Sequence, residues 1–335
     1  MAVLSSCSEF SRGIIGLEGD GMREHDQRAV GAFFAQADEH GVTNDEKARE
    51  RSRVIRRVDT TPKDRSFEDA GGAAGGDFPP GVVEVDGRLV GFGIHILNED
   101  VYPLQSFEIY LRGCDLVGEL DLSGCTDVVF VDLYRNRISS VDVSDMPALR
   151  ILGLQGNLIA SLDPTGLPAC QGIDAGMNRL EAIDVSRNPE LVELYVNGNR
   201  IGSLDTSGNP KLKYLRCQDN LLTELDVTGN PLLRHLYATG NPLKSIRACA
   251  PGSFGAETIE LAAGEGGCVG LSYNPVYDAQ WKETGEWEQG YHAYPDEGFA
   301  FSGWFDEAGA CVSRERDWQD EYGTPRRLVA RFERA

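Results

Sequence analysis

Residues 191–205 read LVELYVNGNRIGSLD, and this stretch decides the fold because its pattern returns every 21 residues. The asparagine at its ninth position recurs along the chain, and a ladder of aspartates keeps the same spacing. The asparagines are Asn136, Asn157, Asn178, Asn199, Asn220 and Asn241, and the aspartates are Asp121, Asp142, Asp163, Asp184, Asp205 and Asp226. A strict period of this length is typical of a solenoid built from stacked coils.

The spacing of the leucines within one unit resembles the leucine-rich repeat. In its Leu-x-Leu core, alternate residues point to opposite faces of a short strand, so Leu194 and Val196 should face inward while Glu193 and Tyr195 face outward. A coil of 21 residues is too short to hold a full helix beside its strand. We therefore expect a mostly β, right-handed solenoid with short convex segments.

Both ladders have structural interpretations. An asparagine that sits where the chain turns inward can bond backbone groups that burial would otherwise leave unpaired. The aspartates precede Ser/Thr-Gly-Asn-Pro-like segments, whose side chains favour turns. A calcium ladder is the alternative, but the clustered Asp-x-Asp-x-Asp-Gly ligand spacing is missing. We expect neither a metal nor a cofactor.

Aligning the outward positions by the period predicts a binding surface on the concave side. Tyrosine and arginine anchor many interfaces, because they combine a large contact area with polar ends. The alternative is that solvated tyrosines merely decorate a sheet, which favours aromatic residues anyway. We expect a protein partner to bind the following residues: Phe130, Asp132, Tyr134, Asp174, Glu193, Tyr195, Tyr214, Arg216, His235 and Tyr237.

The flanking regions differ from the repeats in composition. We expect a poorly ordered or weakly helical region with a Thr43-x-x-Glu46 capping box, a Gly/Pro linker, a β cap with a hairpin turn at Asp86-Gly87, the solenoid and a small β module. Their ranges are 1–70, 71–80, 81–112, 113–250 and 257–335, respectively. The strand Ile109-Tyr110-Leu111 fits the repeat only with one extra residue.

The C-terminal module contains all four tryptophans. Its stretch 291–306 and its closing segment 328–332 resemble the small B-type repeat of internalin-like bacterial surface proteins. The resemblance implies a surface recognition protein, although the internalin period is 22. In a module this small, large aromatic residues are needed for the core. Exposed tryptophans at Trp281, Trp287 or Trp318 would instead favour a carbohydrate-binding adhesin.

An enzyme is not expected. Asp174 and Glu193 should lie about 8 Å apart on adjacent strands, within reach of an inverting glycosidase mechanism, but an open solenoid face offers little desolvation to raise a carboxyl pKa. The five histidines show no metal-ligand spacing, and no Gly-x-Ser-x-Gly or phosphate-loop motif occurs.

Charge and cysteine content bound the remaining possibilities. A formal net charge of −21 argues against nucleic-acid partners, no apolar run approaches a membrane span, and we expect a monomer. Cys170 and Cys217 occupy leucine positions and should be core residues. Pairing of Cys268 with Cys311 is left open.

The location of the protein is also left open. Leu4-Ser5-Ser6-Cys7 resembles a lipobox, which makes Cys7 a lipidation candidate, and the internalin-like resemblance favours the cell surface or the extracellular space. If Met1 is the true start, the chain is a cytoplasmic interaction scaffold.

Overall fold

The structure is a computed structural model of the whole chain, and the part described below excludes several segments. The described residues are 32–33, 35–44, 46–47, 83–85, 88–90, 107–110, 115–126, 128–251, 257–277, 283–319 and 327–335. Cys7, the linker 71–80 and Trp281 lie outside them, as does most of the predicted cap.

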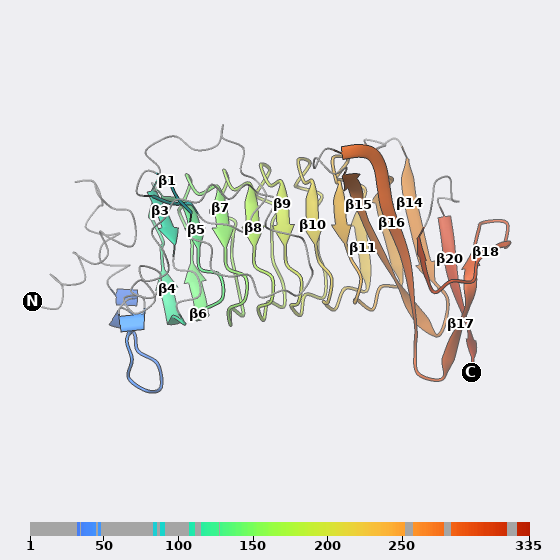
Figure 1. Cartoon of the computed structure of the whole chain (residues 1–335), viewed down its shortest axis with the longest axis horizontal. Coiled ribbons are helices and arrows are strands. Elements are labelled where there is room, and N and C mark those ends of the chain that lie inside the picture. The colour runs from blue at the N-terminus through green and yellow to red at the C-terminus, as the bar shows by residue number, and fades with distance from the viewer. Residues whose placement is uncertain are drawn as a thin grey trace, which may run out of the picture.

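Seven short parallel strands, one per coil, stack along the long axis of the molecule (Figure 1). Leucine, isoleucine and valine alternate with polar or small residues in these strands, which is why one side of the sheet can be buried. Consecutive strands from β5 onward pair with an offset of 21 residues. The strands are β3 (Phe107–Tyr110), β5 (Val128–Asp132), β7 (Ile151–Gly153), β8 (Gly172–Asp174), β9 (Glu193–Tyr195), β10 (Tyr214–Arg216) and β12 (His235–Tyr237).

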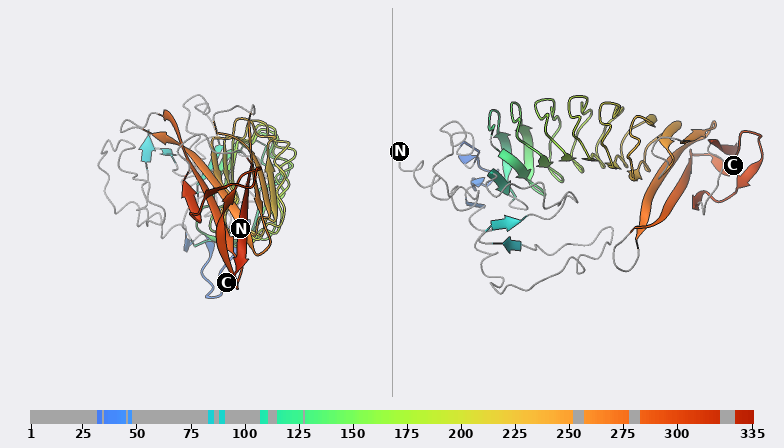
Figure 2. Two further views of the ribbon diagram at one scale, coloured as in Figure 1. Left: turned by 90° about the vertical axis from the view of Figure 1, so that its right-hand side faces the viewer. Right: turned by 90° about the horizontal axis from the view of Figure 1, so that it is seen from above.

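The same sheet continues into the C-terminal module without a break. Strand β15 (Gly267–Tyr277) pairs antiparallel with β12, followed by β16 (Glu283–Pro295) and β19 (Asp317–Gln319), which makes ten strands in all. Seen from above in Figure 2, the long β15–β16 hairpin extends beyond the strand side of the solenoid. The module is therefore joined to the solenoid by main-chain hydrogen bonds.

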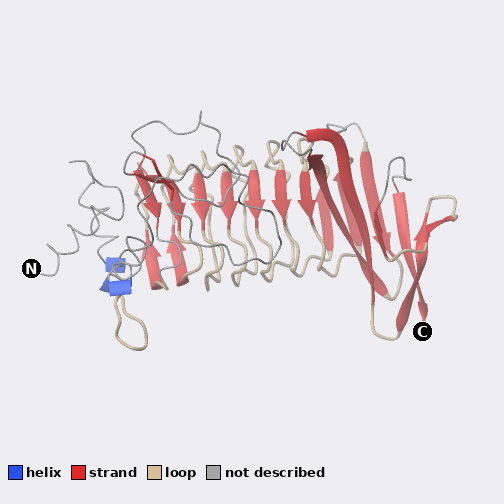
Figure 3. Ribbon diagram, viewed as in Figure 1, coloured by secondary structure: helices blue, strands red, loops and turns tan. Residues whose placement is uncertain are grey.

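The other side of the coils carries fewer strands (Figure 3). The middle coils cross it in extended segments and turns, as expected for so short a repeat. At the two ends, strands form a two-stranded and a six-stranded sheet. The first holds β4 (Val117–Asp121) and β6 (Arg137–Asp142), and the second holds β11 (Glu224–Val227), β13 (Ser245–Cys249), β14 (Thr258–Ala263), β20 (Arg327–Arg334), β17 (Phe299–Phe305) and β18 (Cys311–Ser313).

The first coil departs from the period as the sequence predicted. Ile109 of β3 pairs with Val131, an offset of 22 residues, and a register shift separates Phe107 from Glu108. Before it, β1 (Val83–Val85) and β2 (Arg88–Val90) form the expected antiparallel hairpin.

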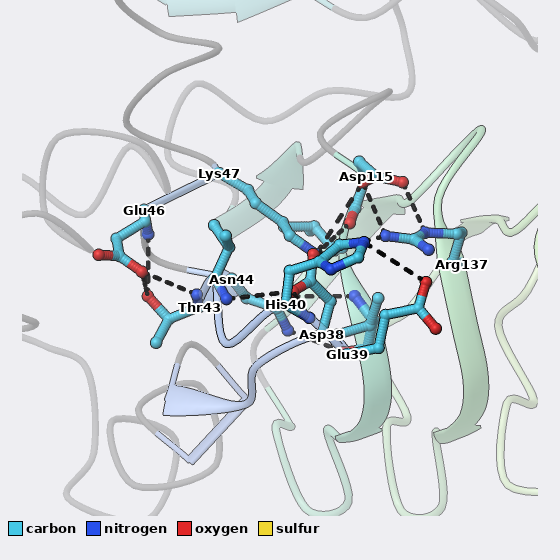
Figure 4. A network of polar contacts seen from close by, with 12 residues as sticks. Asp38, Glu39, His40, Thr43, Asn44, Glu46, Lys47, Asp115 and Arg137 are labelled. Atoms are coloured by element: carbon cyan, nitrogen blue, oxygen red, sulfur yellow. Dashed lines mark hydrogen bonds and ion pairs between the residues drawn. The ribbon is translucent and has the colours of Figure 1, made fainter.

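The described residues between 32 and 47 bond the outer edge of β4, and Figure 4 shows polar contacts of this segment, among them those of Asp38 and Lys47. Phe33 is buried in the solenoid core. The Asn44 side chain bonds the backbone of Val117 in both directions, at 2.8 and 2.9 Å, and Gln36 bonds the backbone of Glu119 in the same way. Side-chain amides thus pair an edge strand that would otherwise be left open.

Two polar contacts hold this capping segment together. Lys47 Nζ lies 3.0 Å from the Asp38 carboxylate, and this hydrogen bond is the main reason that the pKa of Asp38 falls to about 2. The predicted capping box is present, because the Glu46 backbone N–H donates to Thr43 Oγ1 and the Thr43 N–H donates to the Glu46 carboxylate.

The core confirms the mostly β leucine-rich-repeat solenoid. It is a continuous cluster that runs from the first coil into the C-terminal module. Cys170 and Cys217 are buried in it, and burial raises the pKa of each thiol to about 12, as expected of small core residues. Cys268 and Cys311 are both free thiols. Among the described residues, no helix is long and apolar enough to cross a membrane.

Candidate functional site

The register of the long sheet places the predicted outward-facing residues side by side. Glu193, Tyr214 and His235 pair across β9, β10 and β12, and Tyr195, Arg216 and Tyr237 form the neighbouring row. Because the period is exact through these coils, the rows are straight, and adjacent side chains stand about 4.8 Å apart. We call this outward side of the ten-stranded sheet the strand face.

Half of the predicted binding residues are buried in the folded chain. They are Phe130, Asp132, Asp174, Glu193 and Tyr195, of which the most exposed is Asp174 at 7%. Two of the carboxylates have structural contacts: Asp132 accepts a bond from the Tyr134 backbone N–H at 3.0 Å, and Asp174 accepts one from the Gly176 N–H at 3.2 Å. The expectation of an openly solvated face therefore does not hold for these residues of β5, β8 and β9.

The prediction also includes a cluster around Arg216, which is accessible except for the buried Tyr195. We call Tyr195, Tyr214, Arg216, His235 and Tyr237 the Arg216 cluster. The Arg216 guanidinium lies between two rings, 4.9 Å from the centroid of Tyr195 and 5.5 Å from that of Tyr237. Arg216 itself is exposed, while Tyr237 is partly buried. Stacking on two aromatic faces fixes the guanidinium and leaves its donors available to a ligand.

The second aromatic pair of the cluster lies beside this cation. Tyr214 and His235 stack with ring centroids 4.4 Å apart and an angle of 16° between the planes. Burial is the main reason that the pKa of Tyr214 is raised, followed by the nearby Tyr277 and Glu193, and burial also raises the pKa of Tyr237. Both phenols are therefore neutral hydrogen-bonding groups at physiological pH.

The β15–β16 hairpin adds residues that the sequence did not assign to this surface. Tyr237 donates a hydrogen bond to Asn274 Oδ1 at 3.1 Å, and Asn274 donates to the Glu288 carboxylate at 3.1 Å. The Arg234 guanidinium lies 6.0 Å from the Trp287 ring centroid. The period could not indicate these contacts, because the hairpin is antiparallel and does not repeat.

The register extends the strand face across the module as well. Tyr237 pairs with Ser272, Ser272 with Gly290, and Gly290 with Gln319. Their neighbours Leu236, Tyr273 and Tyr291 point into the core. The row that begins in the solenoid thus ends at β19.

The other aromatic residues of the module serve mainly as core. Trp304 is fully buried, and Trp318 packs against the core with Phe301 and Phe332. Trp287 is partly exposed beside Arg234. The structure thus brings only one of the described tryptophans to the edge of the Arg216 cluster.

The carboxylate pair and the metal site considered from the sequence can both be located against the described residues. Asp174 and Glu193 lie on adjacent strands with the expected offset of two positions, since Gly172 pairs with Glu193. Both are buried, so the expectation that an open face gives these carboxylates little desolvation does not hold. No group of three or more His, Cys, Asp or Glu side chains in the described ranges could hold a metal ion.

The six asparagines of the predicted ladder are structural. In all six cases the asparagine side-chain oxygen accepts a bond from a backbone N–H of the preceding coil, for example from Leu180 to Asn199 at 2.9 Å. The amide of Asn199 donates to the carbonyls of Ala175 and Val196. Each ladder aspartate instead accepts the backbone N–H two residues on, as Asp184 does from Ser186.

Comparisons with known proteins add little. No family model and no curated protein matches the chain. Among solved structures, it is similar to the functional domain of InlJ from Listeria monocytogenes, which includes a cysteine ladder (19% identity, TM-score 0.34, covering 63% of this chain and 54% of that one). YopM from Yersinia enterocolitica (23%, 0.32, 40% and 35%) and the internalin InlF from Listeria monocytogenes (18%, 0.26, 36% and 44%) are also similar.

The chain spans about half or less of the length of each of these proteins. With TM-scores this low, the assignment of a leucine-rich-repeat solenoid rests on the period, the strand register and the asparagine bonds described above.

Proposed function

We propose that the chain is a recognition protein that binds a protein partner at the Arg216 cluster. The observation that carries the proposal is the exposed guanidinium held between Tyr195 and Tyr237. An arginine fixed in this way has already lost much of its side-chain freedom, so binding it costs less conformational entropy. Tyr214, His235 and Trp287 add aromatic contact area around it.

The partner surface that fits is one with a carboxylate and an apolar neighbour. A planar guanidinium binds carboxylates through two parallel hydrogen bonds, and the rings beside it can cover an aliphatic or aromatic side chain. In keeping with the internalin-like resemblance, we place this interaction at the bacterial cell surface. Fractionation of cells expressing a tagged full-length chain tests that location, and recovery in the cytosol alone would contradict it.

Binding is tested with a triple variant, Tyr214→Ala, Arg216→Ala and Tyr237→Ala, used as bait beside the wild-type chain. Tyr195 is left intact because it is buried. We expect a partner captured by the wild type to bind the triple variant about tenfold more weakly or worse. The matched control is Arg179→Ala with Arg200→Ala, two exposed residues that directly follow ladder asparagines.

The control should bind as the wild type does, and all three proteins should melt at similar temperatures. Equal affinity of the triple variant and the wild type would remove the Arg216 cluster from the interface. Loss of binding in the control alone would show that the interface includes Arg179 and Arg200 and not the Arg216 cluster.

A further inference from the structure

Three strands of the C-terminal module bring a serine, a histidine and an aspartate together on the strand face. Ser272 lies on β15, His292 on β16 and Asp317 on β19. His292 pairs directly with Asp317, and Ser272 pairs with Gly290, two residues from His292 on the same face. The three side chains therefore form a line across the sheet.

The line is connected by hydrogen bonds through both imidazole nitrogens. Ser272 Oγ lies 3.2 Å from His292 Nε2, and His292 Nδ1 lies 3.1 Å from Asp317 Oδ1. When neutral His292 has its proton on Nδ1, this N–H donates to the Asp317 carboxylate. Nε2 can then accept the hydroxyl proton of Ser272. A nucleophile bonded to a base that a third group orients is the arrangement of a catalytic triad, which is recognised by geometry rather than by sequence order.

Neighbouring residues keep this geometry in place. A Cβ atom at Gly290 would lie 2.8 Å from His292 Nε2 and 3.0 Å from Ser272 Oγ, so a side chain there would push the pair apart. The Tyr294 ring stacks on the His292 ring with centroids 6.4 Å apart and an interplanar angle of 16°. Arg316 contacts the Asp317 carboxylate at 3.1 Å.

The aspartate is ionised at neutral pH, as the arrangement requires. Burial opposes ionisation of Asp317, but the hydrogen bonds from His292 and Arg316 outweigh it, and the pKa of Asp317 falls below its ordinary value. An ionised carboxylate at Nδ1 stabilises the imidazolium that forms when Nε2 accepts a proton.

We propose that Ser272 is an acylable nucleophile and that the module slowly hydrolyses short-chain carboxylic esters. Ser272 Oγ attacks the ester carbonyl carbon while its proton moves to His292 Nε2. The C–O bond to the alcohol then breaks, and that proton leaves on the alcohol. Water, activated by the same nitrogen, cleaves the acyl-serine, which releases the carboxylic acid and restores Ser272.

The open sheet limits both the rate and the substrate. Ser272 lies mid-strand, paired on both sides, away from the loop amides that form the oxyanion hole of efficient hydrolases. Proton transfer to a general base such as His292 raises the reaction rate by about 10²- to 10⁴-fold. Ser272 pairs with Tyr237 and the Tyr294 ring stacks on His292, so aromatic rings on both sides suit a small acyl group with an aryl leaving group. The proposal departs from the sequence-based expectation of a chain without enzymatic activity, and it does not depend on the proposed partner.

The test uses the full-length chain with two probes, a fluorophosphonate and p-nitrophenyl acetate. We expect the phosphonyl group and the acetyl group on Ser272, located by peptide mass spectrometry, and no labelled Ser272 peptide after Ser272→Ala. His292→Asn and Asp317→Asn should lower the labelling rate of Ser272 about tenfold or more. Gly290→Ala should lower it as well, because it separates His292 from Ser272.

The matched control is Ser203, an exposed serine of the solenoid, which should remain unlabelled in every protein. The melting temperature of each variant shows whether it is folded, and Ser272→Ala and His292→Asn change partly exposed side chains. Labelling of Ser203 at the rate of Ser272, labelling of Ser272 that survives His292→Asn, or no labelling of Ser272 at all would each overturn the proposal.

Discussion

Each coil turns at two corners, and buried asparagines occupy the two corners for different reasons. At the first corner, the six coils from β5 onward have the ladder asparagine, and its side-chain oxygen accepts a backbone N–H bond. At the second corner only the last three coils have one, and its amide group donates to carbonyls of the preceding coil. These are Asn188, Asn209 and Asn230, and the equivalent positions in the first three of these six coils are Cys125, Met146 and Leu167, all buried.

The difference lies in what would remain unpaired without the asparagine. At the second corner, the carbonyl of Leu167 already accepts a bond from the Cys170 N–H, and that of Asn188 accepts one from the Leu191 N–H. The side-chain bond is therefore an addition. At the first corner, the asparagine oxygen bonds a backbone N–H that lies inside the solenoid, where water cannot replace it. Only the first corner requires asparagine.

The three asparagines of the second corner differ in whether their side-chain oxygen accepts a hydrogen bond. Thr206 donates its hydroxyl proton to Asn230 Oδ1 at 2.7 Å. The residues at the same place one and two coils earlier are Val185 and Pro164, which have no hydroxyl. Among the described residues, Asn209 Oδ1 and Asn188 Oδ1 have no hydrogen-bond partner. A buried oxygen of this kind costs about 1–3 kcal/mol.

The largest effect is expected from Asn199→Ala. It leaves the Leu180 N–H and the carbonyl oxygens of Ala175 and Val196 without their side-chain partner. We expect the free energy of unfolding to fall by about 3 kcal/mol, because one buried donor is orphaned and two further bonds are lost. Urea titration followed by circular dichroism measures the change.

The comparison variant is Asn209→Leu, which copies the residue found at Leu167. It loses two amide bonds but also removes the unpaired oxygen, so the free energy of unfolding should change by less than about 1 kcal/mol. Equal losses for Asn199→Ala and Asn209→Leu would show that the fold depends on asparagine equally at both corners.

A smaller gain is expected from Val185→Thr. The new hydroxyl would stand where Thr206 stands relative to Asn230 and could donate to Asn209 Oδ1. We expect unfolding to require about 1 kcal/mol more, because a buried acceptor gains its partner. Differential scanning calorimetry of the variant and the wild type measures the shift in melting temperature.

The matched control is Val143→Thr, which places a hydroxyl two coils earlier, opposite the apolar Leu167. With no acceptor there, the buried hydroxyl should destabilise the fold by about 1–3 kcal/mol. If Val143→Thr and Val185→Thr shift the melting temperature in the same direction, the register between successive coils does not position the hydroxyl as the Thr206–Asn230 pair implies.

The sequence predicted the first corner well because its residue never varies along the six coils. The strand rows could be predicted for the same reason, since a fixed offset of 21 residues aligns Tyr195, Arg216 and Tyr237 without any knowledge of the turns. The second corner was interpreted as an ordinary Asn-Pro turn. Its burial was signalled by Cys125 and Met146, apolar residues at the same phase of the period.

Functional residues could be predicted from the sequence only within the solenoid, where the 21-residue period applies. Ser272, His292 and Asp317 come from three antiparallel strands whose register follows no repeat, so no spacing in the sequence connects them. The burial of Asp174 and Glu193 was also missed, because alternation within a strand indicates which side a residue faces but not whether that side is covered.

The smallest expected effect concerns the solvent side of the second corner. The Asp184 carboxylate accepts bonds from the Ser186 hydroxyl and backbone N–H, and these lower the pKa of Asp184 from 3.8. A carboxyl group with a lowered pKa stabilises the fold fully above its unfolded value, and the contribution is lost as the pH falls through the folded value. The urea midpoint of the wild type should therefore decline between about pH 5 and pH 2.

Asp184→Asn should decline less steeply over this range, because the amide oxygen still accepts the Ser186 N–H but does not titrate. Adding Asp163→Asn and Asp205→Asn should flatten the profile further, since the pKa values of both carboxyls are lowered by the same kind of bond. The three carboxylates are solvent-exposed or nearly so, which keeps each effect small. A triple variant as acid-sensitive as the wild type would place the acid-labile contacts elsewhere, with the paired carboxylate of Asp38 as the next to test.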